Sequence, residues 1–311
     1  MKAWQFEGSG KPIALNDVPE PEPGHGEVVI DVRAAGLCHS DIMYMEVGEA
    51  TMPFLPMTQG HENAGVISAL GAGVDGWKIG DVVGVCSSGF RPPLGMFTPG
   101  GFADKLVADA RDLARVPQGI DLSLAALATD AGMTSYHAMI KVGRAATGMK
   151  VGVIGYGGLG QIGTRAAVLA GAEVHVAETK ESVWDLARHA GATDVVADAA
   201  EWAGRNFDLV VDYAGFDTTQ QGIDAIVRGG TVVQVGLGLP TFTVNSPTIL
   251  GKTLIGSLGG TVDDIEEVCE LLAAREIEPA YTEISFTEIG AGLERLRRND
   301  VAGRLVARFG D

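Results

Sequence analysis

A glycine-rich turn at residues 155–160 constrains the fold of this chain more than any other stretch. An apolar run over 150–154 precedes it, and apolar residues recur at helical spacing after it until Gly171. A second apolar stretch then runs to Glu178. The pattern predicts a strand, a tight turn, a helix and a second strand, which is the repeating unit of a parallel sheet.

The turn has the spacing G-x-G-x-x-G, formed by Gly155, Gly157 and Gly160 with Gly158 and Leu159 before the last. The first glycine allows the tight turn, the second lets backbone N–H groups approach a pyrophosphate, and the third lets helix and strand pack closely. A chain with 44 glycines in 311 residues produces such spacings by chance, so an ordinary turn is the alternative. Because strand, helix and acidic residue all fall where a dinucleotide needs them, we predict a dinucleotide site at these five residues.

The acidic residue also indicates which dinucleotide is bound. Glu178 lies 18 residues past Gly160, where the second strand should end. A carboxylate there accepts hydrogen bonds from both hydroxyls of the adenosine ribose and repels a 2′-phosphate. Thr179 and Lys180 follow it, and a cation beside Glu178 would tolerate a 2′-phosphate. The turn therefore favours NAD(H), with NADP(H) as the alternative.

Charge and composition argue against several classes of partner. The formal net charge of -17 opposes binding to nucleic acid or to an anionic membrane surface. No apolar run approaches membrane-spanning length, and the first five residues carry no apolar signal core, which favours a cytoplasmic location. The three cysteines, Cys38, Cys86 and Cys269, are widely spaced and odd in number. Reduced thiols or a metal ligand are therefore favoured over a disulfide framework.

The periodicity along the chain predicts an α/β protein with two kinds of domain. Short strand candidates separated by Gly and Pro occur in the first 120 residues and favour a compact, barrel-like, β-rich domain. From Leu122 onward helical and strand patterns alternate, which predicts a doubly wound parallel sheet covered on both faces. The strand candidates lie at 28–32, 65–67 and 81–85, and then at 151–154, 174–177, 194–196, 209–212, 231–235 and 253–255. Helices are predicted at 182–189 and 218–227.

After Gly260 the pattern returns to the character of the first domain. A helix is predicted over 262–274, a strand-like stretch over 281–286, a second helix over 289–297 and a final strand over 305–309. We therefore predict a discontinuous outer domain made of residues 1–130 and 260–311. The nucleotide-binding domain, residues 131–259, is inserted between its two parts.

Two short stretches of the first domain are rich in metal-ligand residue types. Residues 36–41 contain Cys38, and residues 60–65 contain His61. A thiolate and an imidazole from separate loops suit zinc, which accepts sulfur, nitrogen and oxygen ligands in a tetrahedral arrangement. By residue type alone, a buried thiol at Cys38 and a capped turn histidine at His61 are the simpler alternatives.

Together these motifs resemble the zinc-dependent alcohol dehydrogenases of the medium-chain dehydrogenase/reductase superfamily over nearly the whole chain. The resemblance rests on the opening strands, the glycine turn and five motifs: Gly-Leu-Cys-His-Ser-Asp at 36–41, Gly-His-Glu at 60–62, Gly-Asp at 80–81, Ala-Gly-Met-Thr-Ser-Tyr at 131–136 and Gly-Arg-Leu-Val at 303–306. It implies a Rossmann-type doubly wound parallel sheet inserted into a β-rich GroES-like catalytic domain. It further implies hydride transfer between NAD(H) and an alcohol or its aldehyde or ketone, by a homodimer or homotetramer.

The resemblance implies that Cys38 and His61 bind one catalytic zinc ion. The usual third ligand of the family is a cysteine just before Ala-Gly-x-Thr, and here that position is Asp130. A carboxylate is an acceptable zinc ligand and has the charge of the thiolate that it replaces, so we predict Asp130 as the third ligand. A carboxylate that supports the site without touching the metal, or that lies at a helix end, is the alternative. Residues 86–101 contain only Cys86 where many relatives have a four-cysteine lobe, so no structural zinc is expected.

Further catalytic roles follow from the same resemblance. Asp41 corresponds to the carboxylate that orients the ligating His61, and Glu62 to an acidic residue that assists ligand exchange at the metal. Ser40 corresponds to the hydroxyl that takes the proton of the substrate. Some relatives continue this proton relay with a histidine five residues after the first zinc ligand, where this chain has Met43.

The resemblance also implies cofactor contacts outside the glycine turn. It places Thr134 near the nicotinamide and Arg304 near the pyrophosphate, and it includes His39, Val235 and Leu237 among the cofactor-binding residues. A guanidinium suits this role because it binds phosphate in a forked geometry. Without the resemblance, a solvated surface arginine is an equal reading of residue 304.

Two other functions are compatible with the sequence. Because Asp130 replaces the usual ligand, a zinc-free reductase of the same superfamily that acts on quinones or activated double bonds stays open. A non-catalytic NAD-binding or sensory protein would retain the same fold. Zinc content separates the first alternative from a zinc-dependent enzyme, and a substrate panel with NADH consumption separates the second.

Overall fold

The computed structural model describes residues 1–238 and 241–310, without the side chains of residues 48 and 49. The chain divides into two compact units, the first made of residues 1–133, 260–276 and 281 onward, and the second of residues 134–259 and 277–280. The short segment 277–280 thus belongs to the second unit, although it lies inside the range predicted for the outer domain. The Gln161 side chain holds it there, because its amide donates to the carbonyl oxygen of Ala280 at 3.1 Å and its oxygen accepts from the Ala280 amide at 2.7 Å.

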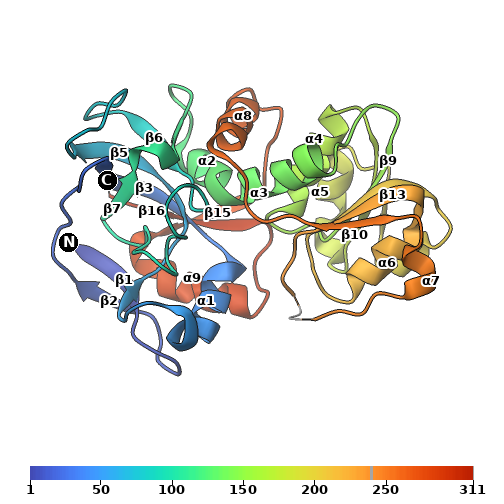
Figure 1. Ribbon diagram of the computed structural model, residues 1–311, viewed down its shortest axis with the longest axis horizontal. Coiled ribbons are helices and arrows are strands. Elements are labelled where there is room, and N and C mark those ends of the chain that lie inside the picture. The colour runs from blue at the N-terminus through green and yellow to red at the C-terminus, as the bar shows by residue number, and fades with distance from the viewer. Residues whose placement is uncertain (239–240, 311) are drawn as a thin grey trace. The chain divides into compact units, whose positions relative to one another are not determined.

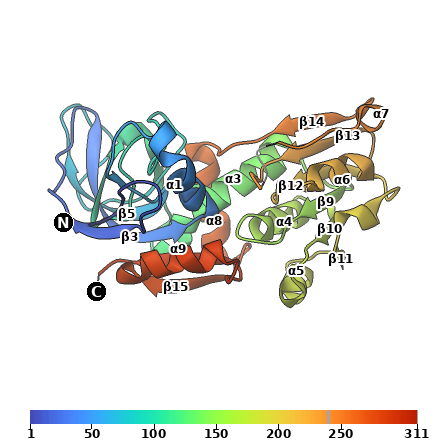
Figure 2. The same cartoon turned by 90° about the horizontal axis from the view of Figure 1, so that it is seen from below.

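The second unit is built on a parallel sheet, which has six strands in the described residues (Figure 2). Its strand order is β11-β10-β9-β12-β13-β14, so the order reverses on the two sides of β9. This confirms the predicted doubly wound sheet, in which ligands bind at the carboxyl ends of the strands where the order reverses. The strands are β9 (Lys150–Ile154), β10 (Glu173–Ala177), β11 (Asp194–Val196), β12 (Phe207–Asp212), β13 (Ile226–Gln234) and β14 (Thr253–Gly256).

Alternation along these strands sends apolar side chains to both faces of the sheet. Val151 and Val153 belong to a core that includes residues of α4 (Gly160–Leu169) and α5 (Trp184–His189). Ile154 belongs to a second core, which includes Trp202 and residues of α6 (Thr218–Ala225) (Figure 1). Both faces are therefore covered, as the near-continuous apolar strands predict. Short helical segments complete this unit: α3 (Met133–Tyr136), η3 (His137–Val142), η4 (Glu181–Val183), η5 (Ala199–Trp202) and α7 (Ser246–Ile249).

The first unit is β-rich and contains two sheets. The larger has the order β15-β16-β3-β5-β6-β8, with β7 also paired to β3, and the smaller has the order β2-β1-β4. The strands are β1 (Lys2–Phe6), β2 (Ala14–Asp17), β3 (Glu27–Leu37), β4 (Met57–Thr58), β5 (Glu62–Leu70), β6 (Val82–Val85), β7 (Lys105–Asp109), β8 (Leu113–Arg115), β15 (Tyr281–Ser285) and β16 (Arg304–Arg308). Its helical segments are α1 (His39–Thr51), η1 (Ala110–Asp112), α2 (Leu122–Leu127), η2 (Ala128–Gly132), α8 (Val262–Ala273), η6 (Phe286–Glu288) and α9 (Ile289–Arg297).

Helix α1 is a correction to the sequence prediction, which has only strands in this part of the chain. Its apolar residues run consecutively from Ile42 to Met45 and so show no clear helical stripe. Tertiary packing decides the structure instead, because Ile42 and Met45 join the core of the first unit. Within the described residues, no helix is long and apolar enough to span a bilayer.

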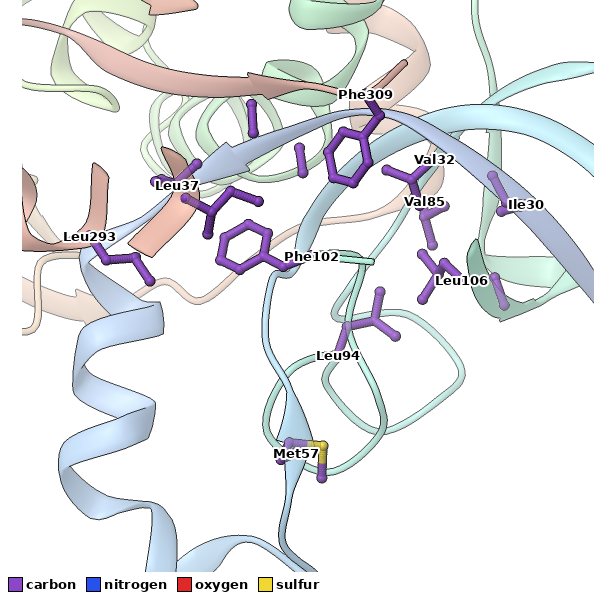
Figure 3. Packing of buried hydrophobic residues seen from close by; sticks show 14 of the residues in the cluster. Ile30, Val32, Leu37, Met57, Val85, Leu94, Phe102, Leu106, Leu293 and Phe309 are labelled. Carbon is purple, nitrogen blue, oxygen red and sulfur yellow. The ribbon is translucent and has the colours of Figure 1, made fainter. Parts of the chain in front are cut away.

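The core of the first unit surrounds Phe102, which is fully buried. Figure 3 shows its ring in a cluster with side chains from β3, β6, β7 and α9. We expect Phe102→Ala to lower the free energy of unfolding by about 3–5 kcal/mol, because it removes a large apolar side chain and leaves a cavity. Urea-induced unfolding measures this loss.

Phe90 offers a matched control, since its ring is 65% exposed. The Phe90→Ala change removes an exposed ring and its contact with the Arg111 guanidinium, which together should cost no more than about 1 kcal/mol. Equal losses in the two variants would show that Phe102 contributes no more to stability than a surface phenylalanine.

Candidate metal centre and coenzyme site

Three strand ends bring the residues of the metal centre together. Strand β3 pairs antiparallel with both β5 and β16, with Gly36 opposite Glu62 and Leu37 opposite Leu305. Because antiparallel neighbours run in opposite directions, the end of β3 lies beside the beginnings of β5 and β16. Residues at these ends, which are far apart in the sequence, therefore share one edge of the sheet.

Cys38 follows β3, His61 precedes β5, and the third donor comes from a helical segment. Asp130 lies in η2, one turn of π-helix that continues α2. The neighbouring Thr129 ties this turn to the sheet, because its hydroxyl accepts from the backbone amide of Asn63 at 3.0 Å and donates to the carbonyl oxygen of Ala126 at 2.7 Å. Such π-turns often mark functional positions, and this one sets the place of the carboxylate.

The three donor side chains converge. One ligand atom from each of Cys38, His61 and Asp130 lies within 4.8 Å of the other two. The Nε2 atom of His61 is 3.3 Å from Oδ2 of Asp130. Both Cys38 and His61 are buried, with 7% and 4% of their surfaces exposed, so water competes weakly for them.

A fully buried carboxylate orients two of these groups. Asp41 accepts from Nδ1 of His61 at 2.7 Å through Oδ1, and from the backbone amide of Cys38 at 2.9 Å through Oδ2. The bond to Nδ1 turns Nε2 of the ring towards the other two donors. The ring of Tyr44 packs against His61 with 5.6 Å between the ring centroids, a contact that sequence reasoning missed.

Glu62 and Arg304 form a buried ion pair beside the donors. The guanidinium donates to Oε2 of Glu62 through Nε at 3.0 Å and also through Nη2, and Nη2 donates to Oδ2 of Asp130 at 2.6 Å. The carboxylates of Glu62 and Asp130 are thus bridged by one cation within the first unit. The predicted contact of Arg304 with the pyrophosphate and the predicted role of Glu62 in ligand exchange stay predictions.

The two carboxyl groups that Arg304 bridges, Glu62 and Asp130, have pKa values shifted in opposite directions. Burial raises the pKa of Glu62 to about 8, although the charge of Arg304 opposes this shift. Burial would also raise the pKa of Asp130, but the charges of His61 and Arg304 outweigh it and hold that pKa well below its usual value. Because Arg304 keeps its charge and donates to Asp130 whether or not His61 is protonated, Asp130 is an anion at neutral pH, the form that binds a metal ion.

Helix α1 supplies the remaining residues predicted for this centre. Ser40 is half-buried, and its Oγ accepts from the thiol of Cys38 at 3.6 Å. His39 is exposed, and its Nε2 lies 3.2 Å from the carbonyl oxygen of Leu296. The serine thus lies directly beside a predicted ligand, whereas the histidine is engaged with the end of α9.

The donor set fits zinc. It offers one sulfur, one nitrogen and one oxygen, the three atom types that zinc accepts, and three protein ligands leave a fourth position for substrate. Oε1 of Glu62 lies against Gly36, where a Cβ would collide with it, and has no hydrogen-bond partner among the described residues.

The second unit carries the predicted glycine turn between β9 and α4. Gly155 has φ +86°, a left-handed conformation that the tight turn requires. Gly160 begins α4, and a Cβ there would collide with the carbonyl oxygen of Gly155. Gly157 has open space around its Cα, which suits the approach of a ligand, and Gly158 and Leu159 lead into the helix.

Glu178 follows β10 and contacts the same turn. Its Oε2 accepts from the backbone amide of Tyr156 at 2.7 Å, and its Oε1 accepts from that of Lys180 at 2.7 Å. The carboxylate therefore lies at the carboxyl end of the sheet, held by the turn that precedes α4. Oε1 also accepts from the Thr179 hydroxyl at 3.4 Å, so Oε2 is the oxygen with a further lone pair for a ligand hydroxyl.

The other predicted coenzyme residues occupy different environments. Thr134 is buried in α3, the first residue of the second unit, and Val235 is buried just after β13. Leu237 is 57% exposed two residues further on. The positions of Val235 and Leu237 beyond the carboxyl end of a strand are those from which parallel sheets contact ligands.

Asp212 organises the neighbouring strand end, and sequence reasoning missed it. Its carboxylate accepts from the amides of Ala214 and Gly215, both at 2.9 Å, and from the hydroxyls of Thr218 and Thr219 at 2.9 and 2.8 Å. These four bonds fix the loop between β12 and α6. The signal available in the sequence was an aspartate at the end of an apolar strand, followed six residues later by two threonines that begin the next helix.

Comparison with known families agrees with this geometry. Residues 24–118 match the alcohol dehydrogenase GroES-like domain, and residues 158–274 match the zinc-binding dehydrogenase domain. An alcohol dehydrogenase of Geobacillus stearothermophilus is 30% identical over 336 aligned positions, which cover 98% of this chain and 99% of that protein.

Two solved structures show the same fold. The acetophenone reductase of Geotrichum candidum, determined in complex with NAD, has a TM-score of 0.90 and 30% identity, and the match covers 100% of this chain and 97% of that one. The alcohol dehydrogenase of the hyperthermophilic archaeon Aeropyrum pernix has a TM-score of 0.86 and 28% identity, with 99% of this chain and 100% of that one covered. The first unit is thus the GroES-like domain and the second the Rossmann-type domain.

These matches span both units and their catalytic motifs. They do not favour a zinc-free quinone reductase or a non-catalytic NAD-binding protein. The donor cluster, the glycine turn and the relatives all lead to one conclusion. The chain belongs to the zinc-dependent alcohol dehydrogenases of the medium-chain dehydrogenase/reductase superfamily, and it is an oxidoreductase of alcohols and their carbonyl counterparts.

Proposed function

We propose that this enzyme transfers a hydride between a small alcohol and NAD, with a single zinc ion held by Cys38, His61 and Asp130. The observation that carries the proposal is the convergence of these three donor atoms within 4.8 Å of one another. The Asp41 carboxylate supports it, because it accepts from the His61 nitrogen that faces away from the other donors. Among the described residues this is the one group of three or more His, Cys, Asp or Glu side chains close enough to hold an ion.

Each side chain of the centre has a defined task in this reaction. When bound, zinc supplies Lewis-acid chemistry that lowers the pKa of an alcohol hydroxyl and polarises a carbonyl. Asp41 keeps the tautomer and orientation of His61, so that Nε2 stays available. From a position beside Cys38, Ser40 would accept the proton of the substrate hydroxyl and pass its own hydroxyl proton on towards the nicotinamide ribose. Burial of the donors excludes water and strengthens each of these interactions.

On the coenzyme side, we propose that Glu178 binds the two ribose hydroxyls of NAD and disfavours NADP. Its position against the amide of Tyr156 supports this, because the glycine turn holds the carboxylate where the second strand ends. In the glycine turn, Gly157 would let the backbone approach the pyrophosphate, while Gly155 allows the tight turn and Gly160 the close packing of helix and strand. The enzyme would act as a homodimer or homotetramer, which light scattering on the purified protein distinguishes.

Metal analysis combined with a substrate panel tests the proposed function. The purified enzyme should contain close to one zinc per chain and should consume NADH with aldehydes or ketones. Chelation should remove both, and zinc should restore them. Full activity on carbonyl compounds after complete removal of zinc would contradict the proposal, as would the absence of turnover with every alcohol and carbonyl tested.

Coenzyme preference is tested by Glu178→Gln, which keeps the shape of the side chain and removes its charge. We expect the Kd for NAD to rise about 10- to 100-fold, the cost of weakening hydrogen bonds to a charged group. The Kd for NADP should fall or stay constant, because the repulsion of the 2′-phosphate is removed. Isothermal titration calorimetry with both coenzymes measures these values.

Glu181→Gln is the matched control, since Glu181 is an exposed glutamate three residues further along. It should leave both Kd values unchanged. If Glu178→Gln binds NAD as tightly as the wild type does, the carboxylate does not recognise the ribose.

A further inference from the structure

Arg304 contacts a predicted zinc ligand, although the family resemblance assigns it to the coenzyme. It is the first residue of β16, and only 4% of its surface is exposed. Its Nη2 donates to Oδ2 of Asp130 at 2.6 Å, and that oxygen also lies 3.3 Å from Nε2 of His61. The guanidinium thus reaches the atom of Asp130 that faces another donor of the metal centre.

A second carboxylate, that of Glu62, also holds the guanidinium in place. Glu62 accepts from Nε of Arg304 at 3.0 Å and also from Nη2, and it is fully buried. Gly36, which lies opposite Glu62 across β3 and β5, makes room for this carboxylate, because a Cβ at residue 36 would collide with it. A planar, rigid cation held by Glu62 through Nε and Nη2 can orient a second carboxylate, Asp130, through the other hydrogen of Nη2.

The contact between Arg304 and Asp130 matters because residue 130 is an aspartate where the family resemblance expects a cysteine. A thiolate has one ligand atom, whereas a carboxylate can rotate and present either oxygen, singly or as a pair. We propose that Arg304 is a positioning residue for Asp130, and that it holds the carboxylate in the orientation that binds zinc. The inference rests on the zinc centre proposed above. It explains how an aspartate serves where the family resemblance expects a cysteine.

Zinc affinity and the visible spectrum of the cobalt-substituted enzyme test this role, because both report on ligand geometry without depending on turnover. Arg304→Gln should weaken zinc binding about 10- to 100-fold in a chelator competition, as loss of groups that orient ligands usually does. It should also change the ligand-field bands of Co²⁺. Arg304→Lys should recover part of the affinity, since a single ammonium keeps the charge but not the fork.

Arg308→Gln is the matched control. Arg308 lies on the same strand and forms surface ion pairs with Asp121 and Glu283. Its loss should leave zinc affinity and the cobalt spectrum unchanged. A change equal to that of Arg304→Gln would show that any arginine of β16 affects the metal through the fold, and would overturn the inference.

A double-mutant cycle with Asp130→Cys separates positioning from a general effect of charge. In the Asp130→Cys background the carboxylate is gone, so Arg304→Gln should cost less than about 3-fold in zinc affinity if the two residues act as a unit. An equal cost in both backgrounds overturns the inference. If Arg304→Gln does not fold, as judged by circular dichroism, Arg304→Lys in both backgrounds provides the same comparison.

Failure of this inference is distinguishable from failure of the zinc centre. Wild-type enzyme that takes up no zinc would overturn both. Wild-type enzyme with bound zinc, together with an Arg304→Gln variant of unchanged zinc affinity and cobalt spectrum, would overturn the inference alone. In that case a raised Kd for NADH in Arg304→Gln would support the contact with the coenzyme that the family resemblance implies for Arg304.

Discussion

Replacing Asp130 with asparagine should abolish stoichiometric zinc binding and lower kcat/KM for alcohol oxidation by about 10³-fold or more. The amide is neutral and a weak ligand, so the Lewis-acid contribution of several kcal/mol is lost. The change also removes the anionic partner of the buried Arg304 guanidinium, whose other partner is the Glu62 carboxyl group. Elemental analysis and steady-state kinetics with NAD measure the two effects.

Asp130→Cys is the informative comparison for this variant. It restores the residue type that the family resemblance expects and keeps an anionic ligand atom at the same position. Zinc content should stay near one per chain, and activity should exceed that of Asp130→Asn by at least about tenfold. An asparagine variant with full zinc and near-normal turnover would show that Asp130 supports the site without binding the metal.

The second large effect is expected at Ser40. Its hydroxyl accepts from the thiol of Cys38 at 3.6 Å, so it lies beside the proposed metal position. Because general acid–base groups contribute about 10²- to 10⁴-fold, we expect Ser40→Ala to lower kcat by that range. Zinc content should not change, since Ser40 is not a proposed ligand. The pH dependence of kcat should also change, because the first step of proton release is lost.

Ser40→Thr retains the hydroxyl and is the matched control for this prediction. It should recover most of the activity that the alanine variant loses. If Ser40→Ala turns over near the wild-type rate across the pH range, the serine does not take part in proton transfer. A loss of zinc in Ser40→Ala would instead indicate that the residue maintains the metal centre.

Much of the fold follows from short-range patterns in the chain. The strands of the nucleotide-binding unit are near-continuous apolar runs, and the structure places strands β9 to β14 over each of them. The two helices after Gly260 were predicted from equally clear stripes, and α9 has the predicted bounds. The predicted strand at 231–235 begins earlier, as β13 starts at Ile226, because Gly229 and Gly230 obscure the alternation. Helix α1 was missed because its apolar residues are consecutive rather than periodic.

The residue types of the metal centre were also readable, since a cysteine and a histidine match a known motif and an aspartate stands where that motif has a third ligand, a cysteine. The chain order carries no information about their distances. His61 and Asp41 are 20 residues apart, and only the pairing of β3 with β5 brings Nδ1 of the ring within 2.7 Å of the carboxylate. The thiol, the imidazole and the carboxylate could be proposed as ligands, but their convergence could not be measured.

Local periodicity and residue chemistry, which depend on neighbours within a few positions, were enough to predict the doubly wound sheet and the glycine turn, and the family resemblance supplied the candidate ligands. The partners of Arg304 were decided by the tertiary structure alone, because Glu62 lies 242 residues away and Asp130 lies 174 residues away. The antiparallel register of β3, β5 and β16 places Glu62 beside the buried guanidinium, and the packing of η2 against β5 places Asp130 there, so both partners depend on the whole first unit.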